Sequence, residues 1–334
     1  CATHADALGL CLDALAELGL PVRMETLDAV GYKAVHGGSI SGARLVDDGL
    51  LAEMERMVSF APAHNPVYIA MMRRMRAKYP ALPQIACFET AFHASVPMER
   101  AVYGVPFEWA EEFGLRRYGF HGSSHSYIAW KLGREAPACR RVISCHLGGS
   151  SSLCAILDGQ SVACSMGATP QSGLFHNNRV GDFDAFCLPA LAGALGGLDE
   201  ALRQLSSKSG LLGLSGLSGD MRDVLEGADQ GNARCRLAVD AFVDSIVGYV
   251  GMFTAYLGGL DALAFTGGIG FHSAAIRRMV CERLGFVGAK LDPLLNESGR
   301  EGPVSNPDSG VAVWALETDE ELMVARSAKQ CLGL

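Results

Sequence analysis

Short apolar segments that end in polar or glycine-rich turns recur along this chain and alternate with segments of helical spacing. The apolar segments predict strands at residues 28–35, 84–88, 141–145, 152–157, 262–265 and 311–316. Helical spacing predicts helices at residues 4–19, 48–59, 198–206, 233–257 and 273–285, and a final helix that ends near 330. This alternation predicts an α/β fold with open, mixed sheets. Because 334 residues exceed one ordinary core, we expect two domains.

The composition excludes several classes of protein. A hydrophobic fraction of 49% argues against extended disorder, and a net charge of −8 argues against a nucleic-acid-binding face. The most apolar long segment, residues 236–260, carries Asp240 and Asp244, so we expect a buried helix and no membrane partner. No signal peptide is visible, and the eleven cysteines form no Cys-x-x-Cys pair. We therefore expect a cytoplasmic protein with buried free thiols.

Two glycine-rich turns follow predicted strands. HLGGSSS at 146–152 bends between two strands, and TGGIG at 266–270 joins a strand to a helix. Glycine lets backbone N–H groups approach an anion, serine hydroxyls add donors, and a helix N-terminus favours phosphate. Either turn alone could be only a turn. Both in one chain that has no Walker-A lysine motif indicate a nucleotide held between two lobes.

Two cations lie in polar surroundings. Arg179 lies in NNRVGDFD, where it could clamp a carboxylate or a transferring phosphoryl group bidentately. The alternative is a surface ion pair with Asp182 or Asp184. Lys33 offers a second cation, with a solvated strand residue as its alternative.

Two acidic residues follow or flank predicted elements. Glu89 ends a buried strand, where a carboxylate can act as a general base or hold a metal, although it could also lie near a helix N-cap. At the last helix, Thr318 and Glu321 have the spacing of a capping box, which leaves Glu320 available for another role. The two prolines of residues 61–66 predict a loop.

His121 and His125 have the i, i+4 spacing of a zinc pair, but no third or fourth ligand is obvious. An imidazole that donates to a phosphoryl oxygen fits the same residues. A zinc-dependent hydrolase is therefore one hypothesis, although it leaves both glycine turns and Arg179 unexplained.

Taken together, these segments closely resemble the acetate kinase family. Ten ordered motifs that span nearly the whole chain carry the resemblance: VHGGS (35–39), APAHNP (61–66), FETAFH (88–93), RRYGFHGSSH (116–125), CHLGGSSSLCAI (145–156), SMGATPQSGL (165–174), NNRVGD (177–182), SGDMRD (218–223), FTGGIG (265–270) and TDEELMVAR (318–326).

The resemblance implies two actin-like (ribonuclease H-like) lobes with mixed sheets flanked by helices, and nucleotide and substrate in the cleft between them. It places residues 1–91 with 322–334 in the N-terminal lobe and residues 92–321 in the C-terminal, nucleotide-binding lobe. It implies reversible transfer of a phosphoryl group from ATP to a short-chain carboxylate, acetate first. The implied cofactor is Mg²⁺, with Mn²⁺ as the alternative. The implied assembly is a homodimer.

The resemblance also implies roles for individual residues. It implies catalytic roles for Glu89, His121 and Arg179, and it implies that Glu320 binds the metal. Binding of the carboxylic acid substrate is assigned to Lys33, His64, Val35, Ala63, Phe120 and Pro170. The nucleotide is assigned to His146, Leu147, Gly148, Gly149, Ser150, Asp220, Met221, Arg222, Gly268, Ile269, Gly270, Phe271 and His272.

The chain departs from the family at several positions. Lys33 replaces an arginine and loses bidentate geometry, and Glu89 is one methylene longer than the usual aspartate. His272 stands where Glu-Asn is usual, and Ala63 replaces a commoner leucine, which predicts that propionate is accepted alongside acetate. The family's first strand carries an Asn-x-Gly-Ser-Ser-Ser-x-Lys-like motif that nothing here matches, so we expect the first strands of the N-terminal lobe to be absent.

Two further hypotheses therefore stand beside an acetate kinase. One is a kinase that prefers propionate or butyrate. The other is a non-catalytic nucleotide-binding remnant, which the unmatched first motif, Lys33 and Glu89 favour.

Overall fold

A computed structural model describes residues 4–20, 22, 24–62 and 64–334. The chain folds into two compact units. The first unit comprises residues 1–91 and 320–334, and the second comprises residues 92–319. Each unit is built around its own mixed sheet with helices on both faces.

The first unit contains a three-stranded sheet in the order β1-β3-β2. The central strand β3 (Gln84–Phe88) is buried along its whole length, as its apolar sequence predicts. It pairs in parallel with β1 (Val30–Ala34), with Lys33 opposite Cys87, and antiparallel with β2 (Ala43–Leu45). The carboxyl ends of β1 and β3 therefore lie at the same edge of the sheet, just before Glu89.

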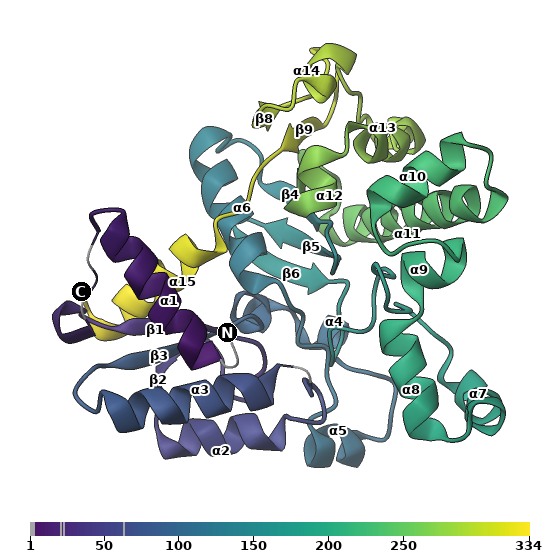
Figure 1. The fold of residues 1–334 in the computed structure, drawn as a ribbon. Helices are drawn as coiled ribbons and strands as arrows, with labels where there is room; N and C mark the ends of the chain where they lie inside the picture. Colours follow the sequence, from purple (N-terminus) through teal and green to yellow (C-terminus); the bar gives the residue numbers. More distant parts are fainter. Residues whose placement is uncertain (1–3, 21, 23, 63) are drawn as a thin grey trace. The chain divides into compact units, whose positions relative to one another are not determined.

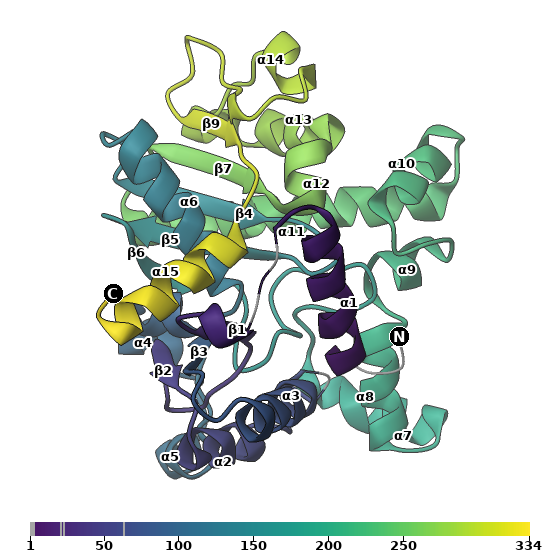
Figure 2. The ribbon, with the colours of Figure 1, turned by 60° about the vertical axis from the view of Figure 1, so that its left-hand side comes forward.

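Helices cover both faces of this sheet. The helices α2 (Asp48–Arg56) and α3 (Asn65–Lys78) pack on one face, and α15 (Glu320–Leu332) packs on the other, as Figure 2 shows. The helix α1 (His4–Glu17) and the 3-10 turn η1 (Met24–Thr26) precede β1. Val324 and Ala328 of α15 contact Ile85 and Cys87, which anchors the end of the chain to the central strand.

Two predictions for this unit are wrong. The loop predicted at 61–66 ends early, because Asn65 already begins α3 and Pro66 takes a first-turn position, where a proline costs no helical hydrogen bond. The capping box predicted before α15 does not form. The helix begins at Glu320, and the Thr318 hydroxyl has no hydrogen-bond partner among the described residues.

The second unit contains a six-stranded sheet in the order β6-β5-β4-β7-β9-β8. An antiparallel meander of β4 (Arg141–His146), β5 (Ser152–Leu157) and β6 (Gln160–Cys164) continues into β7 (Ala262–Thr266) and β9 (Ala312–Ala315), which run parallel to β4. The short edge strand β8 (Gly302–Pro303) is antiparallel to β9. Both glycine-rich turns follow neighbouring central strands of this sheet.

Figure 1 shows α6 (Gly122–Glu135) on one face of this sheet and α11 (Ala233–Leu257) with α13 (Ala274–Arg283) on the other. By length and composition α11 could cross a membrane. Phe242, Ile246 and Phe253 of this helix lie in the main hydrophobic core, however, so it is the buried helix that its two aspartates predict.

The remaining elements of the second unit are short and surround the sheet. They are η2 (Ala91–Ser95), which begins one residue before the unit, α4 (Met98–Ala101), α5 (Phe107–Phe113), η3 (Ala185–Cys187), α7 (Leu188–Leu195), α8 (Leu198–Ser207), α9 (Gly210–Ser215), α10 (Met221–Asp229), α12 (Gly267–His272), η4 (Gly285–Val287) and α14 (Pro293–Glu297).

Candidate active site

The two glycine-rich turns of the second unit are hydrogen-bonded to each other. Leu147 donates its N–H to the Thr266 carbonyl at 2.8 Å, and its own carbonyl accepts the N–H groups of Ile269 and Gly270 at 2.8 and 3.1 Å. Gly267 permits this approach, because it has a φ of 75° and an added Cβ would lie 2.7 Å from the Leu147 oxygen. Two turns separated by more than a hundred residues thus form one structure.

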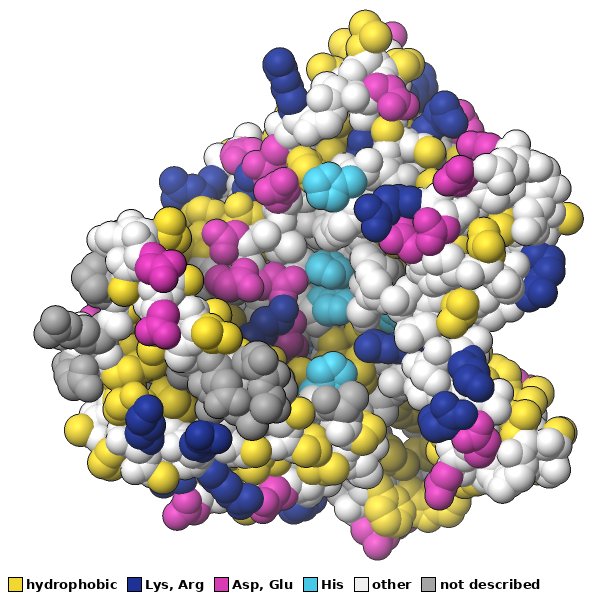
Figure 3. Space-filling view, in the orientation of Figure 1, with side chains coloured by type: hydrophobic (Ala, Val, Ile, Leu, Met, Phe, Trp, Pro, Cys, Tyr) yellow, Lys and Arg dark blue, Asp and Glu magenta, His cyan; other side chains and the backbone are white. Residues whose placement is uncertain are grey.

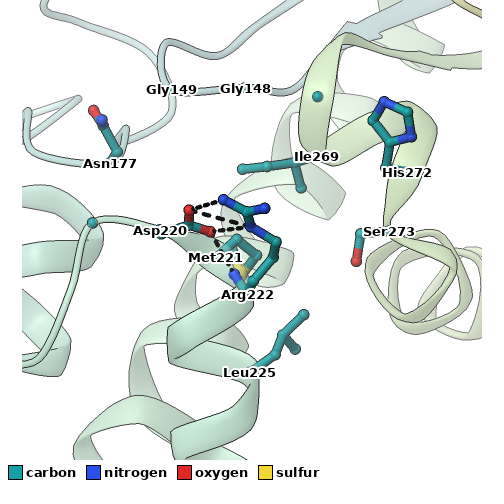
Figure 4. Close-up of a pocket in the computed structure, with 12 residues that line it drawn as sticks. Gly148, Gly149, Asn177, Asp220, Met221, Arg222, Leu225, Ile269, His272 and Ser273 are labelled. Carbon is teal, nitrogen blue, oxygen red and sulfur yellow. Dashed lines mark hydrogen bonds and ion pairs between the residues drawn. The ribbon is translucent and has the colours of Figure 1, made fainter.

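A pocket of about 650 Å³ opens beside these turns. Figure 4 shows its walls, which come from the β4–β5 hairpin, the start of α10 and the helix α12. The lining residues are Gly148, Gly149, Asn177, Gly219, Asp220, Met221, Arg222, Leu225, Gly268, Ile269, His272 and Ser273. Eight of these twelve are residues assigned above to a nucleotide.

At the mouth of this pocket, Arg222 and Asp220 form an exposed ion pair, with Arg222 Nε 3.0 Å from Asp220 Oδ1. Asp220 also caps α10 by accepting the N–H of Arg222 at 2.9 Å. The bonds from Arg222 lower the pKa of the Asp220 carboxyl to about 2. In Figure 3, acidic and basic side chains meet at the surface beside α10.

Five residues assigned to the nucleotide do not line the pocket: His146, Leu147, Ser150, Gly270 and Phe271. Leu147 and Phe271 are buried in the core, where they support the two turns. His146 and Ser150 contact the histidine and arginine side chains described next.

A cluster of histidines and serines lies where α6 meets β4 and β5. His121 ends a turn before α6 with a left-handed backbone (φ 56°). Its Nδ1 lies 2.8 Å from the Ser152 hydroxyl, and its ring stacks on His146 with centroids 4.3 Å apart. His125 is fully buried one turn later, within 2.9 Å of the hydroxyls of both Ser144 and Ser152.

Arg179 is partly buried against the β4–β5 hairpin. Its Nη1 donates to the Ser150 hydroxyl at 3.2 Å and to the Pro170 carbonyl at 3.3 Å, and burial lowers the pKa of its guanidinium. The surface ion pair weighed as its alternative does not form, because Asp182 accepts from Tyr249 instead and Asp184 caps η3. Arg179 and Ser150 thus place a cation beside the first glycine-rich turn.

In the first unit, two carboxylates interact electrostatically with Lys33, which lies near the carboxyl end of β1. Lys33 forms an ion pair with Glu320. Burial acts to lower the pKa of the Lys33 amine, but the charges of Glu89 and Glu320 outweigh it and leave that pKa raised. Glu89 is buried at the end of β3, and its N–H donates to the Ala34 carbonyl at 2.8 Å. Lys33 is therefore not the solvated strand residue of the alternative.

The residues assigned to the acid divide between the units. In the first unit, Val35 is partly buried after β1, and His64 stands at the N-terminus of α3. Phe120 and Pro170 are buried in the second unit. Ala63 lies outside the described residues.

The zinc hypothesis does not fit the geometry of the histidine cluster. Both ring nitrogens of His125 are hydrogen-bonded to serine hydroxyls. Among the described residues, no group of three or more His, Cys, Asp or Glu side chains could hold a metal ion.

Sequence reasoning missed four lining residues: Asn177, Gly219, Leu225 and Ser273. The first two lie inside motifs already singled out, Ser273 follows His272 directly, and Leu225 lies one helical turn after Met221. Ser144 carried no signal in the sequence, and Ser152 was singled out only as part of the first glycine-rich turn, since the bonds of both serines to His125 depend on a helix from another part of the chain.

Comparisons with known proteins agree with this architecture. The sequence profile of the acetokinase family matches residues 1–326. Propionate kinase of Citrobacter rodentium is 44% identical over 332 residues, which cover 97% of this chain and 82% of that protein. Acetate kinase of Bacillus subtilis is 40% identical over 330 residues, 97% of this chain and 83% of that protein.

Solved structures give the same result. The crystal structure of acetate kinase from Porphyromonas gingivalis matches with a TM-score of 0.89 at 34% identity, over 98% of this chain and 84% of that one. That of a propionate kinase from Francisella tularensis matches with a TM-score of 0.90 at 34% identity, over 97% and 84%. The predicted α/β fold with mixed sheets flanked by helices is thereby confirmed.

Proposed function

The chain belongs to the acetokinase family, and from this premise we propose that it phosphorylates a short-chain carboxylate with ATP. The reaction is reversible and gives an acyl phosphate and ADP. The enzyme is a phosphotransferase with a carboxyl group as acceptor. The observation that carries the proposal is the pocket of linked glycine-rich turns beside Arg179 and His121, in a chain that matches the family almost throughout.

We assign the pocket of the second unit to ATP. Its volume of about 650 Å³ lies within the usual range of ligand pockets, roughly 300–1,000 Å³. Gly149 and Gly268 leave its wall without side chains, so phosphate oxygens can approach the backbone. Arg222, His272 and Ser273 add polar groups for the rest of the nucleotide.

Arg179 and His121 are assigned to the transferring phosphoryl group. Phosphoryl transfer needs positioning and charge neutralisation more than covalent chemistry from the protein. Arg179 is already oriented by Ser150, and His121 by Ser152, so both can donate without reorganisation. The acid is ionised at neutral pH, so no residue needs to deprotonate it.

The carboxylates of the first unit suit a divalent cation. Mg²⁺ binds hard oxygen ligands and is usually held by one or two carboxylates together with substrate phosphates. Glu320, which pairs with Lys33, and Glu89, whose charge acts on Lys33, supply such oxygens, and Mn²⁺ would suit the same donors. When bound, the cation would neutralise charge on the phosphates. We assign Glu320 as a ligand, Glu89 as an organiser of the metal or its water, and Lys33 to the carboxylate of the acid.

Acetate is the first candidate acid, and propionate is the second. Both kinds of kinase are among the relatives, at 44% identity for a propionate kinase and 40% for an acetate kinase. Val35, Ala63, His64, Phe120 and Pro170 are assigned to the acyl group on the resemblance alone. Because Ala63 replaces a larger residue, we propose that propionate is accepted alongside acetate.

We further propose that the enzyme acts in the cytoplasm as a homodimer. The described cysteines are free thiols, which suits a reducing compartment. Hydrophobic side chains are exposed over α5, as Figure 3 shows, where Phe107, Trp109 and Phe113 are each more than half exposed. An aromatic surface of this kind is typical of an interface. Light scattering during size-exclusion chromatography tests it: a monomer at every concentration would contradict the dimer.

The test of function is acyl-phosphate formation, trapped as the hydroxamate, with ATP and Mg²⁺ and either acetate or propionate. We expect product with both acids and none when the acid or ATP is omitted. ATP binding without product from either acid would support the nucleotide-binding remnant instead. Propionate turnover far below acetate turnover would contradict the wider acyl specificity.

A further inference from the structure

His125 lies at the centre of a buried chain of hydrogen bonds that ends on His121. Its Nδ1 lies 2.9 Å from the Ser144 hydroxyl of β4, and its Nε2 lies 2.8 Å from the Ser152 hydroxyl of β5. The same Ser152 hydroxyl lies 2.8 Å from Nδ1 of His121. His125, Ser144 and Ser152 are each fully buried, so no water can replace a missing bond.

His125 is neutral in these surroundings. Burial lowers the pKa of its imidazole well below the usual value, and electrostatic interaction with His93 of η2 and His146 of β4 adds to the effect. The rings that face it are those of His93, His146 and His121. A neutral imidazole has one N–H donor and one acceptor nitrogen. The two nitrogens of His125 therefore play opposite roles.

The direction of the chain follows from Ser144. Among the described residues, the Ser144 hydroxyl has one hydrogen-bond partner, Nδ1 of His125. A buried hydroxyl that does not donate its proton is costly, so Ser144 donates to this nitrogen. His125 then carries its proton on Nε2 and donates it to Ser152. Since a hydroxyl has a single proton, Ser152 donates that proton to Nδ1 of His121.

We infer that the chain Ser144–His125–Ser152 keeps the proton of neutral His121 on Nε2, which makes His125 a positioning residue for His121. The inference rests on the proposed function, in which His121 donates a hydrogen bond to the transferring phosphoryl group. His121 Nδ1 is occupied as an acceptor, so Nε2 is the nitrogen that donates. The buried chain thus presents His121 as a ready donor without adding charge to the site.

The first test measures the proton directly and does not depend on activity. Nitrogen-15 NMR of histidine-labelled protein distinguishes an Nε2–H from an Nδ1–H imidazole. We expect neutral His121, identified by the loss of its signals in His121→Gln, to be the Nε2–H form. Ser152→Ala should give a mixture of both forms. A wild-type His121 with its proton on Nδ1, or an unchanged form in Ser152→Ala, would overturn the inference even in an active kinase.

The second test separates positioning from folding by kinetics. Ser152→Ala should lower kcat about tenfold and leave the KM values for ATP and acid nearly unchanged, as for other residues that orient a functional group. Ser144→Ala should lower kcat by a smaller factor. It removes the bond that fixes which nitrogen of His125 carries the proton, but it leaves the bond between Ser152 and His121 in place. His125→Gln can still donate to Ser152 and should retain more activity than His125→Asn, which cannot reach it.

The control is Ser126→Ala, which removes a hydroxyl of the same helix that donates only to the Ser123 carbonyl. It should leave kcat and the NMR signals of His121 unchanged. If both His125 variants fail to fold, the serine variants and the wild-type NMR spectrum still test the inference. Equal losses in Ser152→Ala and Ser126→Ala would contradict the relay. An Nε2–H signal in a protein without kinase activity would instead contradict the proposed function alone.

Discussion

The nucleotide pocket and the histidine–serine cluster are both in the second unit but are built in opposite ways. The pocket is open and lined by backbone, glycine and exposed side chains, such as Arg222 and His272, from contiguous motifs. In the cluster, His125, Ser144 and Ser152 are fully buried, and each of its bonds joins residues from different elements. A binding wall can thus be made from local turns, whereas an oriented catalytic group needs partners brought from elsewhere in the fold.

The largest expected effect separates binding from chemistry. Arg179→Ala should lower kcat about a thousandfold, the lower end of the range for an arginine that stabilises transferring phosphoryl charge, with little change in the KM for ATP. Arg179→Lys should lose less activity than Arg179→Ala, since lysine keeps the positive charge but not the paired N–H donors of the guanidinium group. Steady-state kinetics measure both. Arg140→Ala, which removes an exposed partner of Asp158, serves as the control. A large rise in KM for Arg179→Ala would assign Arg179 to the pocket instead.

Alanine substitutions at two neighbouring glycines, Gly267 beside the pocket and Gly268 in its wall, should differ in their effect on stability. Gly267→Ala places a Cβ 2.7 Å from the Leu147 carbonyl at a φ of 75°, and should reduce the free energy of unfolding by about 2 kcal/mol. Gly268→Ala meets nothing within 4 Å and should leave that free energy nearly unchanged while weakening ATP binding. Denaturant unfolding and ATP titration measure the two. Equal free energies of unfolding for the two variants would contradict the idea that Gly267 is needed for the geometry of the turn and Gly268 for access of the ligand.

Buried histidines should make the protein sensitive to acid. His176 accepts the N–H of Ser151 at 2.7 Å, and burial, aided by Arg179, lowers the pKa of its imidazole to about 3. The unfolded chain binds a proton there below about pH 6.5. The stabilisation is therefore complete above that pH and is lost as the pH falls towards the folded pKa.

Between about pH 7.5 and about pH 5.5, wild type should lose ~1.4 kcal/mol more stability than His176→Asn. The asparagine can still accept from Ser151 but does not titrate. Denaturant unfolding at the two pH values measures the difference. An identical acid loss in both proteins would show that His176 is not held neutral.

The smallest effect is expected at Asn177, a pocket residue that motif reasoning passed over. Asn177→Ala should raise the KM for ATP about threefold, since a single neutral hydrogen bond contributes about 1 kcal/mol or less. The value of kcat should stay near wild type. A change in kcat alone, seen in the same steady-state assay, would move Asn177 from the pocket to the reacting groups.

Sequence patterns predicted the buried elements well. The strand β5 and the helix α11 begin and end where their apolar runs do, and β3 is entirely apolar except for its first residue. The strand β6 was missed, because it begins with two polar residues and follows β5 after a two-residue turn. Asp158-Gly159, both with positive φ, form that turn and are a hairpin signal that could have revealed it.

The candidate site was predictable where chemistry and sequence neighbours coincide. The glycine turns and the Asp220–Arg222 segment are local, and Gly148, Gly149, Gly268 and Ile269 of the turns line the pocket together with that segment. The partners of His125 were not predictable in this way, since two serines from two strands converge on a helix only through the register of β4 and β5. The ion pair of Lys33 with Glu320 likewise joins residues that are 287 positions apart.

The bonds between the two glycine-rich turns bear on how the molecule opens. The Leu147 carbonyl holds the amides of Ile269 and Gly270 across neighbouring central strands. These amides exchange their hydrogens with solvent only when their bonds to the Leu147 carbonyl open, and we expect this opening to be rare because the two turns close the ends of buried central strands. The wall of an open pocket should therefore contain some of the slowest-exchanging amides in the protein, and their rates would report how rarely these bonds open.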